Sequence, residues 1–307
     1  MLVGPGSFFK SHVDTPRSDT MFASLVVILP TKHEGGSLLF RSQGREYAFN
    51  SADAVVTDGE LKAAFVAFYS DVEHEVSVVE SGYRVTLTYN LYFYEIRELT
   101  PIPPSSPLNA DAENRMKSSL EALLNDPKFL PDGGKVGFGL SHKYPFKKDS
   151  TQLSDLEGRL KGTDGLLKQI WEEVFPDIDL KLKVFYSCPG EFSCLATEFA
   201  QISSEEMEDG LSQYLVDECG GEMVYTAAMK TQRGYSSLWE EYPDVRLIEW
   251  LTPMKNVNQF KEMYVAAFGN GPSLGHFYGD ICLVAEIKGA EGRGLGIAAQ
   301  NVASGST

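Results

Sequence analysis

The chain has 307 residues, of which 43% are hydrophobic and 23% are charged. That length is enough to bury one large core or two smaller ones. Lys and Arg total 27 against 43 Asp and Glu, which gives a formal net charge of −16. Such a charge repels phosphate backbones and anionic lipid headgroups, so nucleic acid and membrane surfaces are excluded as expected partners.

Neither a membrane span nor a secretory signal is visible in the sequence. The longest apolar run, Phe22 to Pro30, is far shorter than the roughly 20 residues that a membrane-spanning helix needs. Residues 1–20 carry several charged side chains where a secretory signal has an apolar stretch. We therefore expect a cytoplasmic protein, with the nucleus as the alternative. The four cysteines form no CxxC pair and are expected to be reduced core thiols: Cys188, Cys194, Cys219 and Cys282.

Residues 1–99 are predicted to form one domain of short strands. Runs rich in β-branched and aromatic residues predict strands at Phe22–Leu29, Ser37–Phe40, Glu46–Phe49, Ala63–Tyr69, Glu75–Val79 and Tyr83–Tyr94. Turn-forming pairs such as Gly35-Gly36 and Ser81-Gly82 separate these runs. Many short strands at this spacing favour an antiparallel sandwich, barrel or jelly roll.

Residues 100–130 are predicted to be a proline-rich linker followed by a helix. Four prolines fall within Thr100–Leu108, and they disfavour both a continuing sheet and the start of a long helix. An apolar stripe that includes Met116 and Leu120 then predicts a helix at Ala112–Leu124.

Residues 131–307 are predicted to form a second, α+β domain. A helix is expected at Gly165–Phe175, with Asp164 or Thr163 as its N-terminal cap. Strands are expected at Leu180–Tyr186, Met223–Ala228, Val245–Leu251 and Ile281–Ile287. A degenerate second β-sandwich is one candidate for this domain. The whole chain is thus predicted to be α+β and mainly β.

His12 and Asp14 are the first candidate site residues. Side chains at i and i+2 of a strand project from the same face, so the imidazole and the carboxylate would point together into the sandwich. A third ligand is available in His74, at the start of a later strand. Two histidines and one carboxylate on one face of a cation leave its opposite positions open, as in non-haem Fe(II) oxygenases.

Ten residues after His74, Arg84 stands alone in an apolar strand. A buried guanidinium is costly unless it meets a carboxylate, with which it forms bidentate pairs. Either a protein Asp or Glu or a dicarboxylate ligand is therefore expected beside Arg84.

The remaining histidines are weaker candidates. His33 is expected to be an exposed loop residue, and His142 and His276 are expected to be structural, because neither has a carboxylate or second His at ligand spacing. Glu73 and Glu75 flank His74 and are expected to point away from its face toward solvent.

The pattern His12-x-Asp14, His74 and Arg84 resembles the double-stranded β-helix (jelly roll) of Fe(II)- and 2-oxoglutarate-dependent dioxygenases, most closely the prolyl 4-hydroxylase-like branch. The segments PGSFFKSHVDTPR, PTKHEGGSLLFR and AFYSDVEHEVSVVESGYRVTLTYNLY look like fungal members of that branch. The resemblance covers residues 1 to about 95.

The resemblance implies a ligand set and a reaction. His12, Asp14 and His74 would bind Fe(II), Arg84 would pair with the distal carboxylate of 2-oxoglutarate, and the Thr86 hydroxyl would add a hydrogen bond to it. Hydroxylation of a substrate C–H bond would give succinate and CO2 as co-products, with ascorbate as a further candidate cofactor. Candidate apolar walls of the pocket are Val26, Ile28, Leu38, Phe40, Phe68 and Leu87.

A protein prolyl residue is the substrate to which the resemblance points, and a small molecule is the alternative. The acidic composition favours a basic polypeptide over nucleic acid as a partner. The sequence predicts no oligomeric state.

Members of this family normally carry a helical segment and a full strand before the residues equivalent to Leu2–Gly6. We therefore expect a chain truncated at its amino terminus, whose jelly roll lacks its first strand and helices and exposes an unpaired edge. This motivates a second functional hypothesis, a non-catalytic relative acting as a scaffold or interaction protein. A third hypothesis, a cupin-type metal-binding jelly roll without a 2-oxo acid, predicts that Arg84 pairs with an internal carboxylate.

Overall fold

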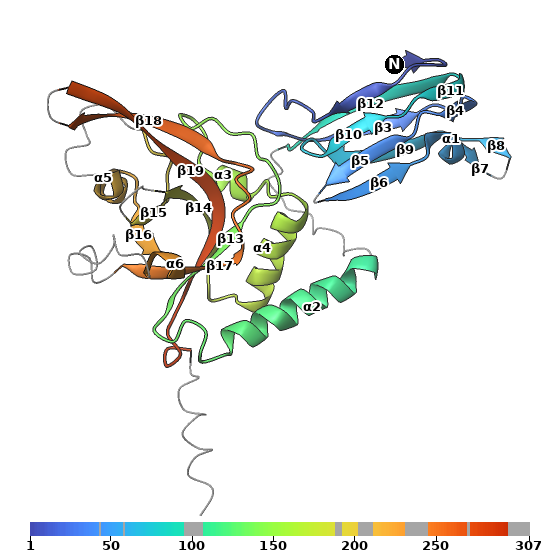
Figure 1. Ribbon diagram of the computed structural model, residues 1–307. Helices are drawn as coiled ribbons and strands as arrows, with labels where there is room; N and C mark the ends of the chain where they lie inside the picture. Colours follow the sequence, from blue (N-terminus) through green and yellow to red (C-terminus); the bar gives the residue numbers. More distant parts are fainter. Residues whose placement is uncertain are drawn as a thin grey trace, which may run out of the picture. The chain divides into compact units, whose positions relative to one another are not determined.

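The computed structural model describes residues 1–42, 44–57, 59–94, 107–187, 192–201, 211–230, 245–268 and 271–293. The chain divides into two compact units, residues 1–99 and 100–307 (Figure 1). Cys188 and residues 100–106 of the expected linker lie outside the described residues.

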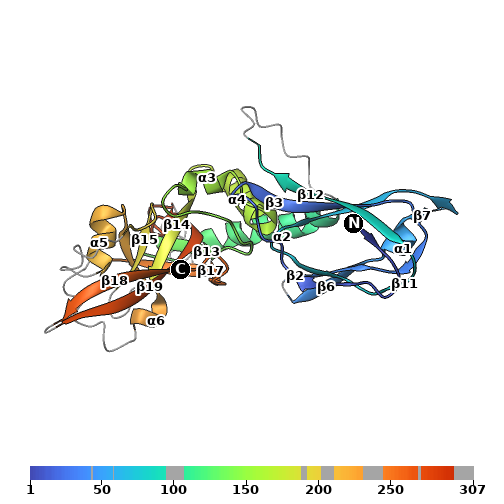
Figure 2. The same cartoon turned by 90° about the horizontal axis from the view of Figure 1, so that it is seen from above.

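The first unit is built from two four-stranded antiparallel sheets, which Figure 2 shows edge-on as two layers. One sheet has the order β1 (Leu2–Val3), β12 (Arg84–Tyr92), β3 (Met21–Ile28) and β9 (Ala64–Tyr69). The other has the order β2 (Phe9–His12), β10 (Glu73–Val76), β5 (Leu38–Ser42) and β6 (Arg45–Phe49). Residues of both sheets share one core, which includes Val26, Ile28, Leu38 and Phe40. The expectation of a mainly β unit with short strands is confirmed.

Smaller elements complete the first unit. The helical turn α1 (Ser51–Ala54) begins after Asn50, whose side chain accepts hydrogen bonds from the amides of Ala52 and Asp53. Two short ladders join β4 (His33–Gly35) to β11 (Val79–Gly82) and β7 (Val56–Thr57) to β8 (Glu60–Leu61).

The second unit contains one closed sheet. Six strands follow one another around it: β13 (Gly134–Gly139), β17 (Arg246–Thr252), β16 (Glu222–Tyr225), β15 (Ser193–Ala196), β14 (Leu180–Ser187) and β19 (Gly271–Ile287). Pairing of β13 with β19 closes the barrel, and β18 (Phe260–Phe268) extends β19 as a hairpin. The helices are α2 (Pro107–Leu124), α3 (Leu153–Glu157), α4 (Gly162–Val174), α5 (Leu211–Glu218) and α6 (Ala227–Lys230). These strands form a barrel rather than two facing sheets.

Three local expectations for the second unit differ from the structure. Helix α2 begins at Pro107 because a proline fits the first helical position, where its missing N–H would have no intrahelical partner. The expected strand at Met223–Ala228 ends at Tyr225, and α6 follows. Asp164 does not cap its helix: its buried carboxylate accepts hydrogen bonds from the amides of Ser141 and His142.

Three cysteines fall within the described residues, and all three are buried: Cys194, Cys219 and Cys282. Burial raises the pKa of the Cys194 thiol to about 12. These thiols are core residues, as the sequence predicts. Among the described helices, none is both long and apolar enough to cross a membrane.

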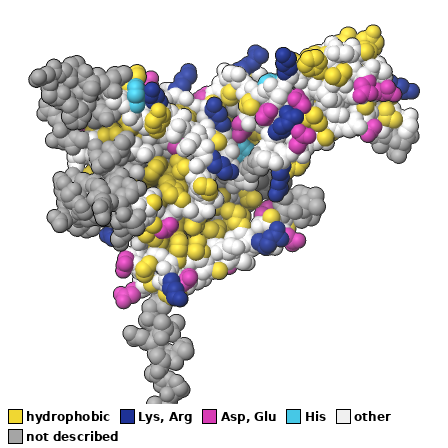
Figure 3. Space-filling view, viewed as in Figure 1, with side chains coloured by type: hydrophobic (Ala, Val, Ile, Leu, Met, Phe, Trp, Pro, Cys, Tyr) yellow, Lys and Arg dark blue, Asp and Glu magenta, His cyan; other side chains and the backbone are white. Residues whose placement is uncertain are grey.

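The outer face of the β1-β12-β3-β9 sheet is apolar. Cross-strand rows on this face join Leu87 to Val27 and Phe65, and Tyr89 to Leu25 and Ala67. Phe65 is 71% exposed and Leu87 is 45% exposed, so Leu87 is not a wall of the pocket, contrary to the prediction. Apolar side chains are also exposed at the end of this unit where the N-terminus lies, including Met1, Leu2 and Tyr83 (Figure 3, upper right).

Strand β9 is an edge strand, since in the described residues it pairs only with β3. Its sequence, AFVAFY, has no charge, which favours pairing with other chains. We expect Phe65→Lys to reduce aggregation, measured by light scattering at increasing protein concentration. Because Phe65 is exposed, the free energy of unfolding should change by no more than about 0.5 kcal/mol. Unchanged aggregation would show that this edge is not the association site.

Asp280 in β19 provides a test of stability against pH. Burial raises the pKa of its carboxyl to about 6, above the ordinary value of about 3.9. Ionisation therefore destabilises the fold: the penalty is absent below about pH 4, grows up to about pH 6 and is constant above it. We expect Asp280→Asn to raise the free energy of unfolding at pH 7 by on the order of 1–3 kcal/mol and to leave it nearly unchanged at pH 3.5.

Urea unfolding at the two pH values measures this effect. The control is Asp179→Asn, because Asp179 is exposed and its pKa is lowered by its hydrogen bond with Lys181. Asp179→Asn should give no gain in stability at pH 7, and an equal gain in both variants would contradict the assignment to Asp280.

Candidate metal centre

The structure brings His12, Asp14 and His74 together in the first unit. His12 ends β2 and is the direct cross-strand partner of His74 in β10. Antiparallel pairing places opposite side chains on one face, and the centroids of the two imidazole rings are 4.3 Å apart. Asp14 lies just beyond the end of β2 rather than within a strand, so the expected strand spacing of His12 and Asp14 is not what joins them.

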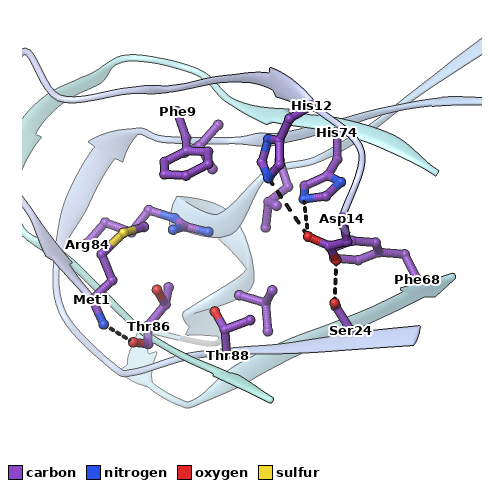
Figure 4. A pocket seen from close by; sticks show the side chains of 13 residues that line it. Met1, Phe9, His12, Asp14, Ser24, Phe68, His74, Arg84, Thr86 and Thr88 are labelled. Carbon is purple, nitrogen blue, oxygen red and sulfur yellow. Dashed lines mark hydrogen bonds and ion pairs between the residues drawn. The ribbon is translucent and has the colours of Figure 1, made fainter. Parts of the chain in front are cut away.

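One oxygen of Asp14 faces both imidazoles. Its Oδ1 lies 3.9 Å from Nε2 of His12 and 3.9 Å from Nε2 of His74 (Figure 4). One potential ligand atom from each residue lies within 4.8 Å of the other two, and among the described residues this is the one group of three such side chains. A first-row metal ion makes bonds of about 2.0–2.2 Å to nitrogen and oxygen, so one ion can bridge each separation of 3.9 Å.

Backbone carbonyls set the orientation of both imidazoles. Nδ1 of His12 lies 2.9 Å from the carbonyl oxygen of Lys10, and Nδ1 of His74 lies 3.0 Å from that of Val72. A carbonyl can only accept, so each Nδ1 donates and each Nε2 is turned to the side of Asp14. Such a second bond from the ring is typical of metal-binding histidines.

Ser24 orients the carboxylate of Asp14. Its hydroxyl, on β3, donates to Oδ2 of Asp14, which leaves Oδ1 to face the imidazoles. Ser24 is buried in an otherwise apolar strand. This role of Ser24 was not predicted from the sequence, although a lone hydroxyl in the run Phe22–Leu29 is a usable signal.

Aromatic side chains surround the three polar groups on the protein side. The Phe68 ring is 4.5 Å from the His74 ring, and the Phe9 ring is 4.8 Å from the His12 ring. His74 is buried, whereas the side chain of His12 is 36% exposed. The group is therefore held on one side by a packed wall and is open on the other.

A cavity of about 230 Å³ extends from this group between the two sheets. Strands of both sheets, together with Met1 and Asp14 outside the strands, supply the residues that line it: Met1, Phe9, His12, Asp14, Ser24, Val26, Leu38, Phe68, His74, Val76, Arg84, Thr86 and Thr88. Three of the predicted walls, Val26, Leu38 and Phe68, therefore line the cavity. Ile28 and Phe40 belong to the core cluster of the unit.

Arg84 and Thr86 enter the cavity from β12. Both side chains are buried, and the Arg84 guanidinium points into the cavity toward the side that holds the histidines (Figure 4). Nη2 of Arg84 is buried and has no hydrogen-bond partner, while Nε donates to Oγ of Ser51 at 3.3 Å. Burial lowers the pKa of Arg84, because desolvation disfavours its charged form.

No carboxylate among the described residues forms an ion pair with Arg84. The cupin-type hypothesis predicts that a protein carboxylate pairs with Arg84, and the described residues contain no such pair. A guanidinium with an unpaired, buried N–H fits a ligand that supplies a carboxylate from inside the cavity.

His33 was wrongly predicted to be an exposed loop residue. It is buried at the start of β4, where Nδ1 lies 2.9 Å from the Thr31 carbonyl oxygen and Nε2 lies 3.0 Å from Oγ of Ser51. The pairing of β4 with β11 turns the ring inward, which the sequence around Gly35-Gly36 did not reveal.

Glu73 and Glu75 point away from the cavity, as expected, but they are not simply solvated. Both pair with Arg41 of β5 on the outer face of the sheet, at 3.6 and 2.9 Å. The hydrogen bond from Arg41 lowers the pKa of Glu75. These outer ion pairs leave His74 as the side chain that β10 contributes to the metal group.

Residues 1–92 match the family model of the 2OG-Fe(II) oxygenase superfamily, a range that contains His12, Asp14, His74, Arg84 and Thr86. Among solved structures, one match is an oxidoreductase of the 2OG-Fe(II) oxygenase family from Burkholderia pseudomallei, with 23% sequence identity, a TM-score of 0.24 and coverage of 29% of this chain and 38% of that one. Another is a prolyl-4-hydroxylase from Pseudomonas putida, with 26% identity, a TM-score of 0.23 and coverage of 30% and 49%. The chain spans less than half the length of either protein. No curated protein matches the chain.

We expect the first unit to bind one divalent metal ion per chain. His74→Ala should abolish binding of Mn²⁺ measured by isothermal titration calorimetry, because it removes one of three ligands. Ser24→Ala should weaken the affinity about tenfold, since the Asp14 carboxylate loses its orienting bond. His276→Gln is the matched control: this exposed histidine lies in the second unit. Full binding by the His74→Ala variant would contradict the assignment.

Proposed function

We propose that the chain is an Fe²⁺- and 2-oxoglutarate-dependent dioxygenase whose residues 1–99 form a double-stranded β-helix of the prolyl 4-hydroxylase-like type. One observation carries the proposal: the unpaired, buried guanidinium of Arg84 faces the same cavity as two histidines and a carboxylate. The match of residues 1–92 to the 2OG-Fe(II) oxygenase superfamily supports it.

His12, Asp14 and His74 would hold Fe²⁺, and Arg84 with Thr86 would hold the distal carboxylate of 2-oxoglutarate. When bound, iron and 2-oxoglutarate supply with O2 the oxidation of a substrate C–H bond to an alcohol, with succinate and CO2 as co-products. Two imidazoles and a carboxylate are ligands of Fe(II), and their grouping on one side of the cavity leaves the other side for exchangeable ligands.

The charges on the residues favour a dianion as the cavity ligand. Arg84 contributes a positive charge with no protein counter-ion among the described residues, and a carboxylate placed against Nη2 would compensate its burial. Thr86 is two residues further along β12 and projects from the same face, so its side chain lines the same cavity as Arg84. The two side chains together can bind both oxygens of one carboxylate.

The apolar lining excludes water from the reacting atoms. Val26 and Leu38 lie on facing sheets, and Phe68 packs against His74. A wall without hydrogen-bonding groups protects a reactive centre from side reactions with solvent. Phe9, which lines the cavity and is 45% exposed, offers an apolar rim to an incoming substrate.

The substrate is proposed to be a protein prolyl residue, with a small molecule as the alternative, and ascorbate is proposed as an accessory reductant. A cytoplasmic site of action, or alternatively a nuclear one, is proposed because Cys194 and Cys282 are buried thiols outside any disulfide. The non-catalytic scaffold hypothesis has no feature of the cavity in its favour, since the proposed ligands and Arg84 share one cavity.

Formation of succinate from 2-oxoglutarate tests the proposal. We expect the wild-type chain with Fe²⁺, ascorbate and O2 to release succinate, and His74→Ala to reduce the rate at least a hundredfold. Glu73→Gln is the matched control, because Glu73 neighbours His74 but points to the outer face. If wild type and His74→Ala release succinate at the same background rate, the chain is not a dioxygenase.

A further inference from the structure

Ser51, the first residue of α1, is buried at the back of the cavity wall and contacts three polar groups. Its Oγ accepts from Nε of Arg84 at 3.3 Å and lies 3.0 Å from Nε2 of His33 and 2.8 Å from the carbonyl oxygen of Gly36. Ser51 itself has no exposed surface. All hydrogen bonds of the Ser51 hydroxyl must therefore be made with neighbouring protein groups rather than with water.

The single hydroxyl proton of Ser51 is donated to the Gly36 carbonyl oxygen. Nε2 of His33 lies 3.0 Å from the same Oγ, and Nδ1 of His33 donates to the Thr31 carbonyl, because a carbonyl cannot donate. A lone pair of Ser51 accepts from Nε of Arg84. His33 and Gly36 therefore fix the position of the oxygen that Arg84 contacts.

The stem of Arg84 is confined by the backbone of Gly36. A Cβ at Gly36 would lie 2.9 Å from Cδ of Arg84, and the φ angle of Gly36 is +66°. Only glycine combines this backbone conformation with such a close approach without strain. The guanidinium is thus held along its stem by Gly36 and at Nε by Ser51, and Nη2 is left for the cavity.

We propose that Ser51, supported by His33, is a positioning residue that aims the Arg84 guanidinium at the distal carboxylate of the 2-oxo acid. This inference rests on the proposed function of the cavity. Its physical basis is that a long, rotatable side chain binds a carboxylate bidentately only in a narrow range of orientations. Fixing Nε before the ligand arrives reduces the entropy that binding costs.

Binding of 2-oxoglutarate to the full chain tests the role of Ser51. We expect Ser51→Ala to raise the Kd about tenfold in the presence of saturating Mn²⁺, which takes similar ligands to Fe²⁺. The measurement is isothermal titration calorimetry without O2 turnover. In steady-state assays with Fe²⁺, the KM for 2-oxoglutarate should rise by a similar factor while kcat changes less than twofold.

A second ligand separates positioning from a general structural role. 2-Oxobutyrate has the 2-oxo acid group but lacks the distal carboxylate, so its affinity should be the same in wild type and Ser51→Ala. Ser70→Ala is the matched control, because Ser70 is equally buried and donates to the Phe22 carbonyl without contacting Arg84. The control should leave both affinities at the wild-type values.

Ser51→Cys keeps the side chain close to its original size and serves if Ser51→Ala does not fold. The thiol is a weaker acceptor, so an intermediate Kd for 2-oxoglutarate is expected. Wild-type affinity in the folded Ser51 variants would overturn the inference while leaving the proposed function intact. Equal losses for 2-oxoglutarate and 2-oxobutyrate would also overturn it. If the wild-type chain binds no 2-oxoglutarate at all, the proposed function fails and the inference fails with it.

Discussion

The buried positive charge of Arg84 is the constraint on which the rest of the first unit depends. A guanidinium that is 1% exposed loses most of its hydration, and no carboxylate among the described residues replaces it. The protein satisfies only part of its hydrogen-bonding capacity, through Ser51. Nη2 of Arg84 has no protein partner among the described residues, and Arg84 lines the cavity. The burial of this charge therefore determines where the proposed binding site lies.

On the opposite side of the cavity, the side chains of His12, Asp14 and His74 are oriented by hydrogen bonds within the protein. Both rings are oriented by carbonyl oxygens two residues earlier in the chain, which accept hydrogen bonds from Nδ1 and so turn Nε2 of His12 and His74 inward. Asp14 obtains its orientation from Ser24 on the facing sheet. The three side chains proposed as metal ligands are therefore oriented by the protein itself, which would lower the cost of assembling a metal site. A metal ion held by these three side chains would put positive charge at one end of the cavity, and Arg84 puts positive charge at the other end. Two positive ends would suit an elongated dianion.

The sequence allowed prediction of the residues whose chemistry is unusual for their surroundings. A histidine and a carboxylate near a strand, a second histidine, and an arginine in an apolar strand are each conspicuous, and the structure places His12, Asp14, His74 and Arg84 around one cavity. The supporting residues were beyond reach, because Ser51 and His33 act through the pairing of segments that the sequence does not show to be neighbours. Leu87 was a different kind of error. Alternation along β12 puts Arg84 and Thr86 inside, and it therefore puts Leu87 outside.

The weak attachment of β2 has a consequence for the empty and loaded forms of the unit. Among the described strands, β2 forms a backbone ladder with β10 alone, by the pairs His12–His74 and Phe9–Val76 with a bulge between them. His12 and His74 are thus both a cross-strand pair and two of the proposed metal ligands. An ion bound by His12 and His74 would link the edge strand β2 to its neighbour β10. Loss of the ion would leave β2 free to separate from the sheet. Metal content and resistance of the segment around residues 9–14 to proteases should then vary together.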